Sequence, residues 1–315
     1  MKSVRSSILV TFIVVACIAH TSAAVSQGSD AVIQIHGELI WRGLTNIQTS
    51  AADMKTRFSV ILNGCRYRME ETEHPTAHPQ ILYSDGTYWY HEVAIPKGYV
   101  ASNVMRMTAQ GPVFTPLKKP VAPKPILEVS PIIEPILPRI TSLLPIWMAF
   151  GSGCHFVHET SPEIPAMFVM KPGPLSQIVL LKADRALGKN GGLESYTDYW
   201  DTSVFAAPPP SPRGLTNIAF QVTTWTNFDG TSIPATFRFL RYYLAPTGTP
   251  KYYQSMDGSG RVTKIDRLNA PLAFRPTITT NTLVAHFSAM NWEPVTYSAT
   301  NGLLKTQEEV DEGRR

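Results

Sequence analysis

The histidines near the middle of the sequence are the residues whose types and spacing best suit chemistry. His155, His158 and Glu159 follow Cys154 in a His-X-X-His-Glu arrangement. Two imidazoles and a carboxylate can bind zinc and leave one position open for water. The spacing matches no established zinc motif, however, and polar surface histidines explain it more simply. We therefore expect no metal and no other cofactor, and a metal-dependent hydrolase is the least favoured function.

No familiar catalytic motif occurs elsewhere. The sequence contains no Gly-X-Ser-X-Gly elbow, no Walker loop, no Gly-X-Gly-X-X-Gly fingerprint and no His-Glu-X-X-His motif. We therefore predict no catalytic residue, and a protein that is not an enzyme.

Aromatic residues indicate a different chemistry, the binding of apolar groups. Residues 80–91 predict a hairpin around Asp85-Gly86, and both of its faces are apolar or aromatic. Such rings can line a pocket for acyl groups, although ordinary sheet core explains each single ring as well. With the rings of a later hairpin, the candidate ligand-binding residues are Tyr83, Tyr88, Trp89, Tyr90, Phe220, Phe237 and Phe239.

The first residues indicate export. Lys2 and Arg5 precede an apolar run at residues 8–19, and the sequence then becomes small and polar up to Ala24. This is the order of a secretory signal peptide, and the apolar run is too short to span a bilayer. We predict cleavage after Ala24, no transmembrane segment in the mature chain, and a periplasmic or extracellular location. Lipid attachment at Cys17, which would anchor the protein to a membrane, is the alternative.

Charge and cysteine content limit the partners. Cleavage of residues 1–24 lowers the formal charge from +4 to +2, and the sequence has no Lys/Arg cluster. It therefore predicts no nucleic-acid partner and no footprint for an acidic membrane. Cys65 and Cys154 remain, and an oxidising compartment favours a disulfide between them. The disulfide would stabilise the fold by about 4 kcal/mol. Two separate buried thiols are the alternative.

Alternating apolar residues predict the strands that carry these groups. In residues 31–41, Ile33 and Ile35 share one side with Leu39 and Trp41. Residues 57–70 predict a hairpin with a two-residue type I′ turn at Asn63-Gly64.

The predicted hairpins have defined registers. The turn at Asn63-Gly64 pairs Val60 with Tyr67, and the turn at Asp85-Gly86 pairs Leu82 with Trp89. A third hairpin, residues 216–244, turns at Asp229-Gly230. It pairs Val222 with Phe237 and Phe220 with Phe239, and places Pro234 at an edge or a bulge.

Prolines change the character of the chain from Pro112 to Pro145. Their density disfavours a regular helix or a central strand, yet the residues between them are apolar. We interpret the segment as an extended piece of chain laid over the body, with a linker as the alternative. The predicted organisation is one β-rich domain at residues 25–315, interrupted by a proline-rich segment at residues 112–145.

Several of these features together resemble a known family. A signal peptide and a strand ending in Arg42-Gly43 are followed by the Arg-Phe-Ser-Val-Ile-Leu-Asn-Gly-Cys-Arg-Tyr-Arg hairpin from Arg57. Then come Ser-Asp-Gly-Thr-Tyr-Trp-Tyr at 84–90 and Asn-Phe-Asp-Gly-Thr-Ser-Ile-Pro-Ala-Thr-Phe-Arg-Phe at 227–239. This order resembles the periplasmic lipoprotein carriers, the LolA/LolB-like proteins, over about half of the mature chain. The chain is longer than a typical carrier, and the proline-rich segment has no counterpart in the family.

The resemblance implies a fold and a function. The fold would be mainly β (α+β), with a curved antiparallel sheet that forms an incompletely closed barrel and a few covering helices. The concavity of such a sheet receives acyl chains. We therefore expect an extracytoplasmic, non-enzymatic binding protein for a hydrophobic ligand, a lipid or a lipoprotein. A cell-surface structural or protein-interaction module, in which the proline-rich segment docks a partner, is the alternative.

Overall fold

The computed structural model is mostly β-structure. It describes residues 32–42, 53–72, 80–93, 101–108, 111–121, 126–131, 143–153, 180–188, 191–200, 215–245, 251–269, 272–288 and 291–313. The strands are β1 (Val32–Arg42), β2 (Met54–Asn63), β3 (Arg66–Thr72), β4 (Gln80–Ser84), β5 (Tyr88–Val93), β6 (Ala101–Thr108), β7 (Gly111–Val121), β8 (Ile126–Pro131), β9 (Leu180–Leu187), β10 (Leu193–Trp200), β11 (Leu215–Phe228), β12 (Thr231–Ala245), β13 (Lys251–Leu268), β14 (Leu283–Ser288) and β15 (Asn291–Ser298). The helices are α3 (Leu144–Phe150) and α5 (Gln307–Glu312).

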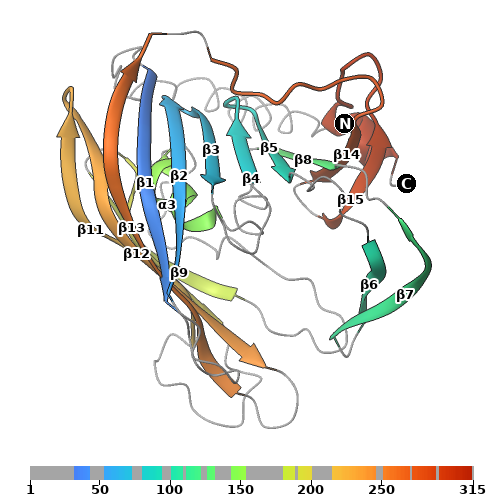
Figure 1. Ribbon diagram of the computed structural model, residues 1–315, viewed down its shortest axis with the longest axis horizontal. Helices are drawn as coiled ribbons and strands as arrows, with labels where there is room; N and C mark the ends of the chain where they lie inside the picture. The colour runs from blue at the N-terminus through green and yellow to red at the C-terminus, as the bar shows by residue number, and fades with distance from the viewer. Residues whose placement is uncertain are drawn as a thin grey trace, which may run out of the picture.

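One large sheet dominates the fold. Its thirteen strands run in the order β15-β14-β8-β5-β4-β3-β2-β1-β13-β12-β11-β10-β9, so that β15 and β9 are its edges and the sheet does not close into a barrel. All of its pairs are antiparallel except β14 with β8, and β6 and β7 form a separate two-stranded sheet. Figure 1 shows that the sheet curves around α3. The predicted fold class, a curved and incompletely closed sheet with few helices, is confirmed.

The alternation predicted for the first strand is present in β1. Ile33, Ile35, Leu39 and Trp41 are buried, and the residues between them are partly exposed, apart from Gly37. The buried side faces α3, and we call this side of the sheet the concave face and the opposite side the outer face.

Glycines on the concave face allow aromatic rings to lie flat across neighbouring strands. A Cβ atom on Gly37 would lie 2.1 Å from Cζ of Phe58, and one on Gly260 would lie 2.0 Å from Cζ of Phe237. Rings that cover a glycine on the neighbouring strand are a common device in strongly curved sheets. A side chain at either position would therefore require the covering ring to move.

The registers of the first two hairpins differ from the prediction. Val60 pairs with Met69 instead of Tyr67, because Asn63 stays in the strand and the turn consists of Gly64 and Cys65. Gly64 alone has positive φ there, whereas a type I′ turn needs two such residues. A shift of two residues leaves each side chain on its predicted face.

The second and third hairpins show how the turn decides the register. Ser84, not Leu82, pairs with Trp89, because the carboxylate of Asp85 accepts hydrogen bonds from two backbone N–H groups and extends the loop. The third prediction is confirmed: Val222 pairs with Phe237 around Asp229-Gly230, both with positive φ. The register also shifts beside Pro234, as expected for a bulge.

The proline-rich segment contains a central strand, contrary to the prediction. β8 lies between β5 and β14 inside the large sheet. Its residues 126–130 contain no proline, and Pro131 is the last residue of the strand. The segment also ends in α3, which has proline in its first turn, a position that tolerates it. The division into domains stays a prediction.

Candidate functional site

The concave face is apolar across both halves of the sheet. A single buried cluster joins side chains from β1, β2, β3 and β5 with others from β10, β11 and β12. Its largest fully buried members are Trp89, Trp147, Tyr67, Tyr196, Phe58, Phe237 and Phe239. The curvature of the sheet therefore encloses an apolar space.

Helix α3 occupies that space. Every residue from Leu144 to Ala149 is buried, and the helix has no side-chain N-cap and no charged residue in its first or last turn. The rings of Trp147 and Trp89 pack edge to face, with their centroids 5.9 Å apart. The ring centroid of Phe150 lies 5.8 Å from that of Phe58 and 5.9 Å from that of Phe237. Burial, and not capping, therefore holds the helix in place.

Polar atoms lie within this apolar region. The Oη of Tyr67 is fully buried and has no hydrogen-bond partner among the described residues. The side chains of Trp147, Trp89 and Ser84 lie near it and act on its pKa. Burial raises the pKa of Tyr67 far above its usual value, and these neighbours lower it only in part. The phenol is therefore neutral, with a hydroxyl that can donate to an oxygen atom.

His91 is a second polar group on the concave face. It lies two residues after Trp89 on β5, so both side chains point to the same face. Its Nδ1 lies 2.6 Å from the carboxylate of Glu128 on β8. Its Nε2 is buried and makes no hydrogen bond among the residues that the structure describes. The carboxylate thus orients the ring and directs Nε2 towards the interior. Sequence analysis missed this pair because Glu128 lies in the proline-rich segment.

Four of the predicted ligand-binding residues lie together on the concave face. Trp89, Phe220, Phe237 and Phe239 all belong to the cluster around α3 and are at most 2% exposed. Phe220 and Phe237 have ring centroids 5.9 Å apart. Their role in binding stays a prediction.

The other three predicted residues lie on the outer face. Tyr83 and Tyr90 are buried in a second cluster with residues of β8 and β14, and Tyr88 packs against it. Neighbouring side chains of a strand point to opposite faces, which separates Tyr88 and Tyr90 from Trp89. The structure therefore does not bring the seven residues into one group.

Asp85 connects this second cluster to the segment that follows β13. Its carboxylate accepts hydrogen bonds from the Tyr90 hydroxyl at 2.6 Å and from the guanidinium of Arg275. Burial alone would raise the pKa of Asp85, but these bonds and those from the N–H groups of Tyr88 and Thr87 hold it below its usual value. Asp85 is therefore a structural carboxylate.

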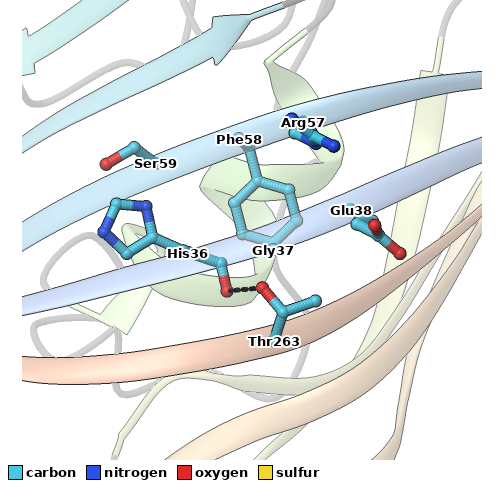
Figure 2. A pocket seen from close by; sticks show the side chains of 7 residues that line it. All are labelled: His36, Gly37, Glu38, Arg57, Phe58, Ser59 and Thr263. Atoms are coloured by element: carbon cyan, nitrogen blue, oxygen red, sulfur yellow. Dashed lines mark hydrogen bonds between the residues drawn. The ribbon is translucent and has the colours of Figure 1, made fainter.

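The outer face of the central strands is polar and carries a depression of about 290 Å³. Figure 2 shows the residues that line it, which come from β1, β2 and β13: His36, Gly37, Glu38, Arg57, Phe58, Ser59 and Thr263. The register of β1 against β13 shifts at His36 and Gly37, and the Thr263 hydroxyl donates to the carbonyl of His36 at 3.2 Å. A β-bulge thus opens the depression.

Several predicted residues lie outside the described part of the chain. These are the signal peptide with Cys17, and Cys154 with His155, His158 and Glu159. The disulfide between Cys65 and Cys154 stays a prediction. Among the described residues, no group of three His, Cys, Asp or Glu side chains is placed to hold a metal ion. No helix in the described ranges is long and apolar enough to cross a membrane.

Comparisons with known proteins include a distant likeness to a solved structure. No protein-family model matches the chain, and no curated protein matches it. Among solved structures, it is similar to a LolA superfamily protein from Nitrosomonas europaea, with 10% sequence identity and a TM-score of 0.36. The match covers 78% of this chain and 89% of that chain. The fold class stated above follows from the strands of this chain.

Proposed function

We propose that this chain is an extracytoplasmic, non-enzymatic binding protein. Its ligand is a hydrophobic molecule or a lipidated protein, held by its acyl chain in the concave face. The observation that carries the proposal is the apolar lining of that face, which spans both halves of the sheet and is filled by one short apolar helix. The signal-like first residues support a location outside the cytoplasm.

The energetics of α3 favour reversible binding. Burial of a large apolar side chain stabilises by about 1.5–3 kcal/mol, so Leu144, Ile146, Trp147 and Met148 together contribute about 6–12 kcal/mol. An acyl chain of about 14 methylenes gains about 11 kcal/mol on burial. An acyl chain that replaces α3 would therefore exchange one set of apolar contacts for another of similar free energy. Neither state would be so stable that the ligand is held permanently.

The buried polar atoms suit an acyl chain with an oxygen-bearing head. The Tyr67 hydroxyl has no acceptor among the described residues, and a carbonyl oxygen would supply one. The Tyr67 ring packs against the end of α3, since a Cβ atom on the C-cap residue Gly151 would lie 3.1 Å from it. Displacement of the helix would therefore expose the Tyr67 side chain. An acyl ester or a fatty acid fits this pattern better than a plain hydrocarbon.

A matched pair of variants tests the proposal. The affinity of the mature chain for a fluorescent fatty acid is measured for the unmodified protein, Phe239→Leu and Tyr83→Leu. Both substitutions replace a buried aromatic ring with a smaller side chain, but Phe239 lies on the concave face and Tyr83 on the outer face. We expect Phe239→Leu to weaken binding about fivefold, from the loss of about 1 kcal/mol of apolar contact, and Tyr83→Leu to leave it unchanged.

Circular dichroism checks that both variants are folded. Native mass spectrometry of the gently purified protein adds an independent measurement, and we expect co-purifying lipid. Absence of any uptake of the fatty acid, or an equal loss of affinity in both variants, would contradict binding in the concave face.

A further inference from the structure

The central strands of the outer face place carboxylates beneath cations. Glu38 on β1 lies 2.7 Å from Lys55 and 2.7 Å from Arg261. The Glu38 side chain is only 14% exposed, whereas those of Lys55 and Arg261 are 53% and 64% exposed. The hydrogen bonds from Lys55 and Arg261 lower the pKa of Glu38, so it is ionised and neutralises one of the two cations.

The same arrangement repeats farther along these strands. Asp257 on β13 is 9% exposed and lies 3.0 Å from Arg238 and 3.7 Å from Arg42. Both arginines are more than half exposed. Around Glu38 and Asp257 the cations are therefore more exposed than the carboxylates, although Glu38 also lines the depression.

The depression on the outer face lies within this charged region. Arg57 on β2 lies opposite Glu38 on β1 in the strand register. It lines the depression together with His36 and Ser59. Ser59 Oγ accepts a hydrogen bond from the amide of Gln34 at 3.3 Å, which leaves its own proton available to a ligand. The imidazole of His36 and the guanidinium of Arg57 add further N–H donors.

We propose that the outer face at this depression binds a phosphate-type oxyanion. Its cationic ligands are Arg57, which lines the depression, and Arg261, which lies beside it on Glu38, and its hydrogen-bond donors are Ser59 and His36. A guanidinium matches two oxygens of a phosphate at once. The Glu38 carboxylate is bound by two cations, Lys55 and Arg261, which leaves positive charge in excess beside the depression. The oxyanion is a free phosphate or the head group of an anionic lipid. This site opens on the outer face, although the Phe58 ring of the concave-face cluster forms part of its lining, and it does not depend on the function proposed for the concave face.

The test compares two double variants with equal loss of charge. Arg57→Gln/Arg261→Gln removes the cationic ligands. Arg267→Gln/Lys305→Gln removes two exposed cations elsewhere, and Arg267 is, like Arg261, in one ion pair, with Asp229. Binding of inorganic phosphate is followed by calorimetry. Flotation with phosphatidylglycerol vesicles, and with phosphatidylcholine vesicles as the neutral control, measures binding to a lipid head group.

We expect binding to phosphate or to phosphatidylglycerol vesicles, weakened about tenfold in Arg57→Gln/Arg261→Gln and little changed in the control. Phosphate binding in solution identifies a free anion as the ligand, and binding to phosphatidylglycerol vesicles alone identifies a lipid head group. The proposal is overturned if neither binds at low salt, or if both double variants lose the same affinity. Fatty-acid uptake in the concave face should be unaffected by either variant, which separates this result from the test of the proposed function.

Discussion

Substitution of Gly37 by alanine tests the close contact between β1 and the Phe58 ring. The added Cβ would lie 2.1 Å from Phe58 Cζ and 2.6 Å from the carbonyl oxygen of Arg261. Ordinary carbon contacts are about 3.5–4.0 Å, so the ring would have to retreat by about 1.5 Å. It lies against Phe150 at 5.8 Å and Phe237 at 6.2 Å, and is 2% exposed, which leaves it little room.

We expect Gly37→Ala to lower the free energy of unfolding by about 3 kcal/mol, the upper end of the range for overpacking. Urea denaturation of the purified protein measures this value. In a Phe58→Leu background the ring tip is gone, and the same substitution should cost about 1 kcal/mol. The double-mutant cycle therefore predicts a coupling free energy of about 2 kcal/mol between the two positions.

Gly64→Ala is the matched control for this cycle. Gly64 has φ of 57° and no atom within 4 Å of the position of an added Cβ. Its substitution should cost about 1 kcal/mol from the left-handed backbone alone, equally with Phe58 or with leucine at position 58. A Gly37→Ala cost that is below about 1 kcal/mol, or that is the same in both backgrounds, would refute the packing argument.

Two further predictions concern the outer cluster and the C-terminal helix. Asp85→Asn should destabilise the protein at neutral pH, since the folded carboxylate is held ionised by Tyr90, Arg275 and two N–H groups. Because its pKa is lowered on folding, this stabilisation is present above the ordinary pKa of aspartate and is lost as the pH falls through the lowered value. Denaturation at several pH values should show the difference between variant and parent vanish in acid; a constant difference would contradict the assignment. The Thr306 side chain caps α5 by accepting a hydrogen bond from the N–H of Glu309. Thr306→Ala removes this cap and should lower the free energy of unfolding by about 1 kcal/mol. Hydrogen exchange should then speed up at residues 307–312 near the buried Val310, and unchanged protection there would contradict a role for the cap.

The hairpins show where local sequence is sufficient and where it is not. Asp229 and Gly230 both adopt positive φ, so the sequence rule for a two-residue turn gave the right register. At Gly64 and Asp85 the turn is set by which residue leaves the strand and which side chain caps the loop. These choices differ by little free energy locally, and the surrounding sheet decides between them.

The candidate site was found only in part from sequence. Aromatic residues at alternating positions correctly indicated a buried sheet, and Trp89, Phe220, Phe237 and Phe239 do meet on one face. Tyr83, Tyr88 and Tyr90 lie on the other, where Ile278, Ala299 and Leu304, from the segments before and after β14 and β15, belong to the same cluster. Sequence periodicity identifies both faces of a strand, but not which distant element packs on each.

The sequence by itself determined the β-rich class, the alternation of the strands and the resemblance to lipoprotein carriers. Each follows from local spacing, because side chains in a strand alternate with a period of two. The tertiary structure alone decided what fills the sheet and what its outer face presents. Helix α3 enters the concavity, whereas the short apolar run that forms it is equally compatible with a helix or a strand when considered as sequence alone. The charged outer face joins residues such as Glu38 and Arg261, which are 223 positions apart. No run of basic residues in the sequence indicates this charged face, because pairing of β1 with β13 brings together charges that are dispersed along the chain.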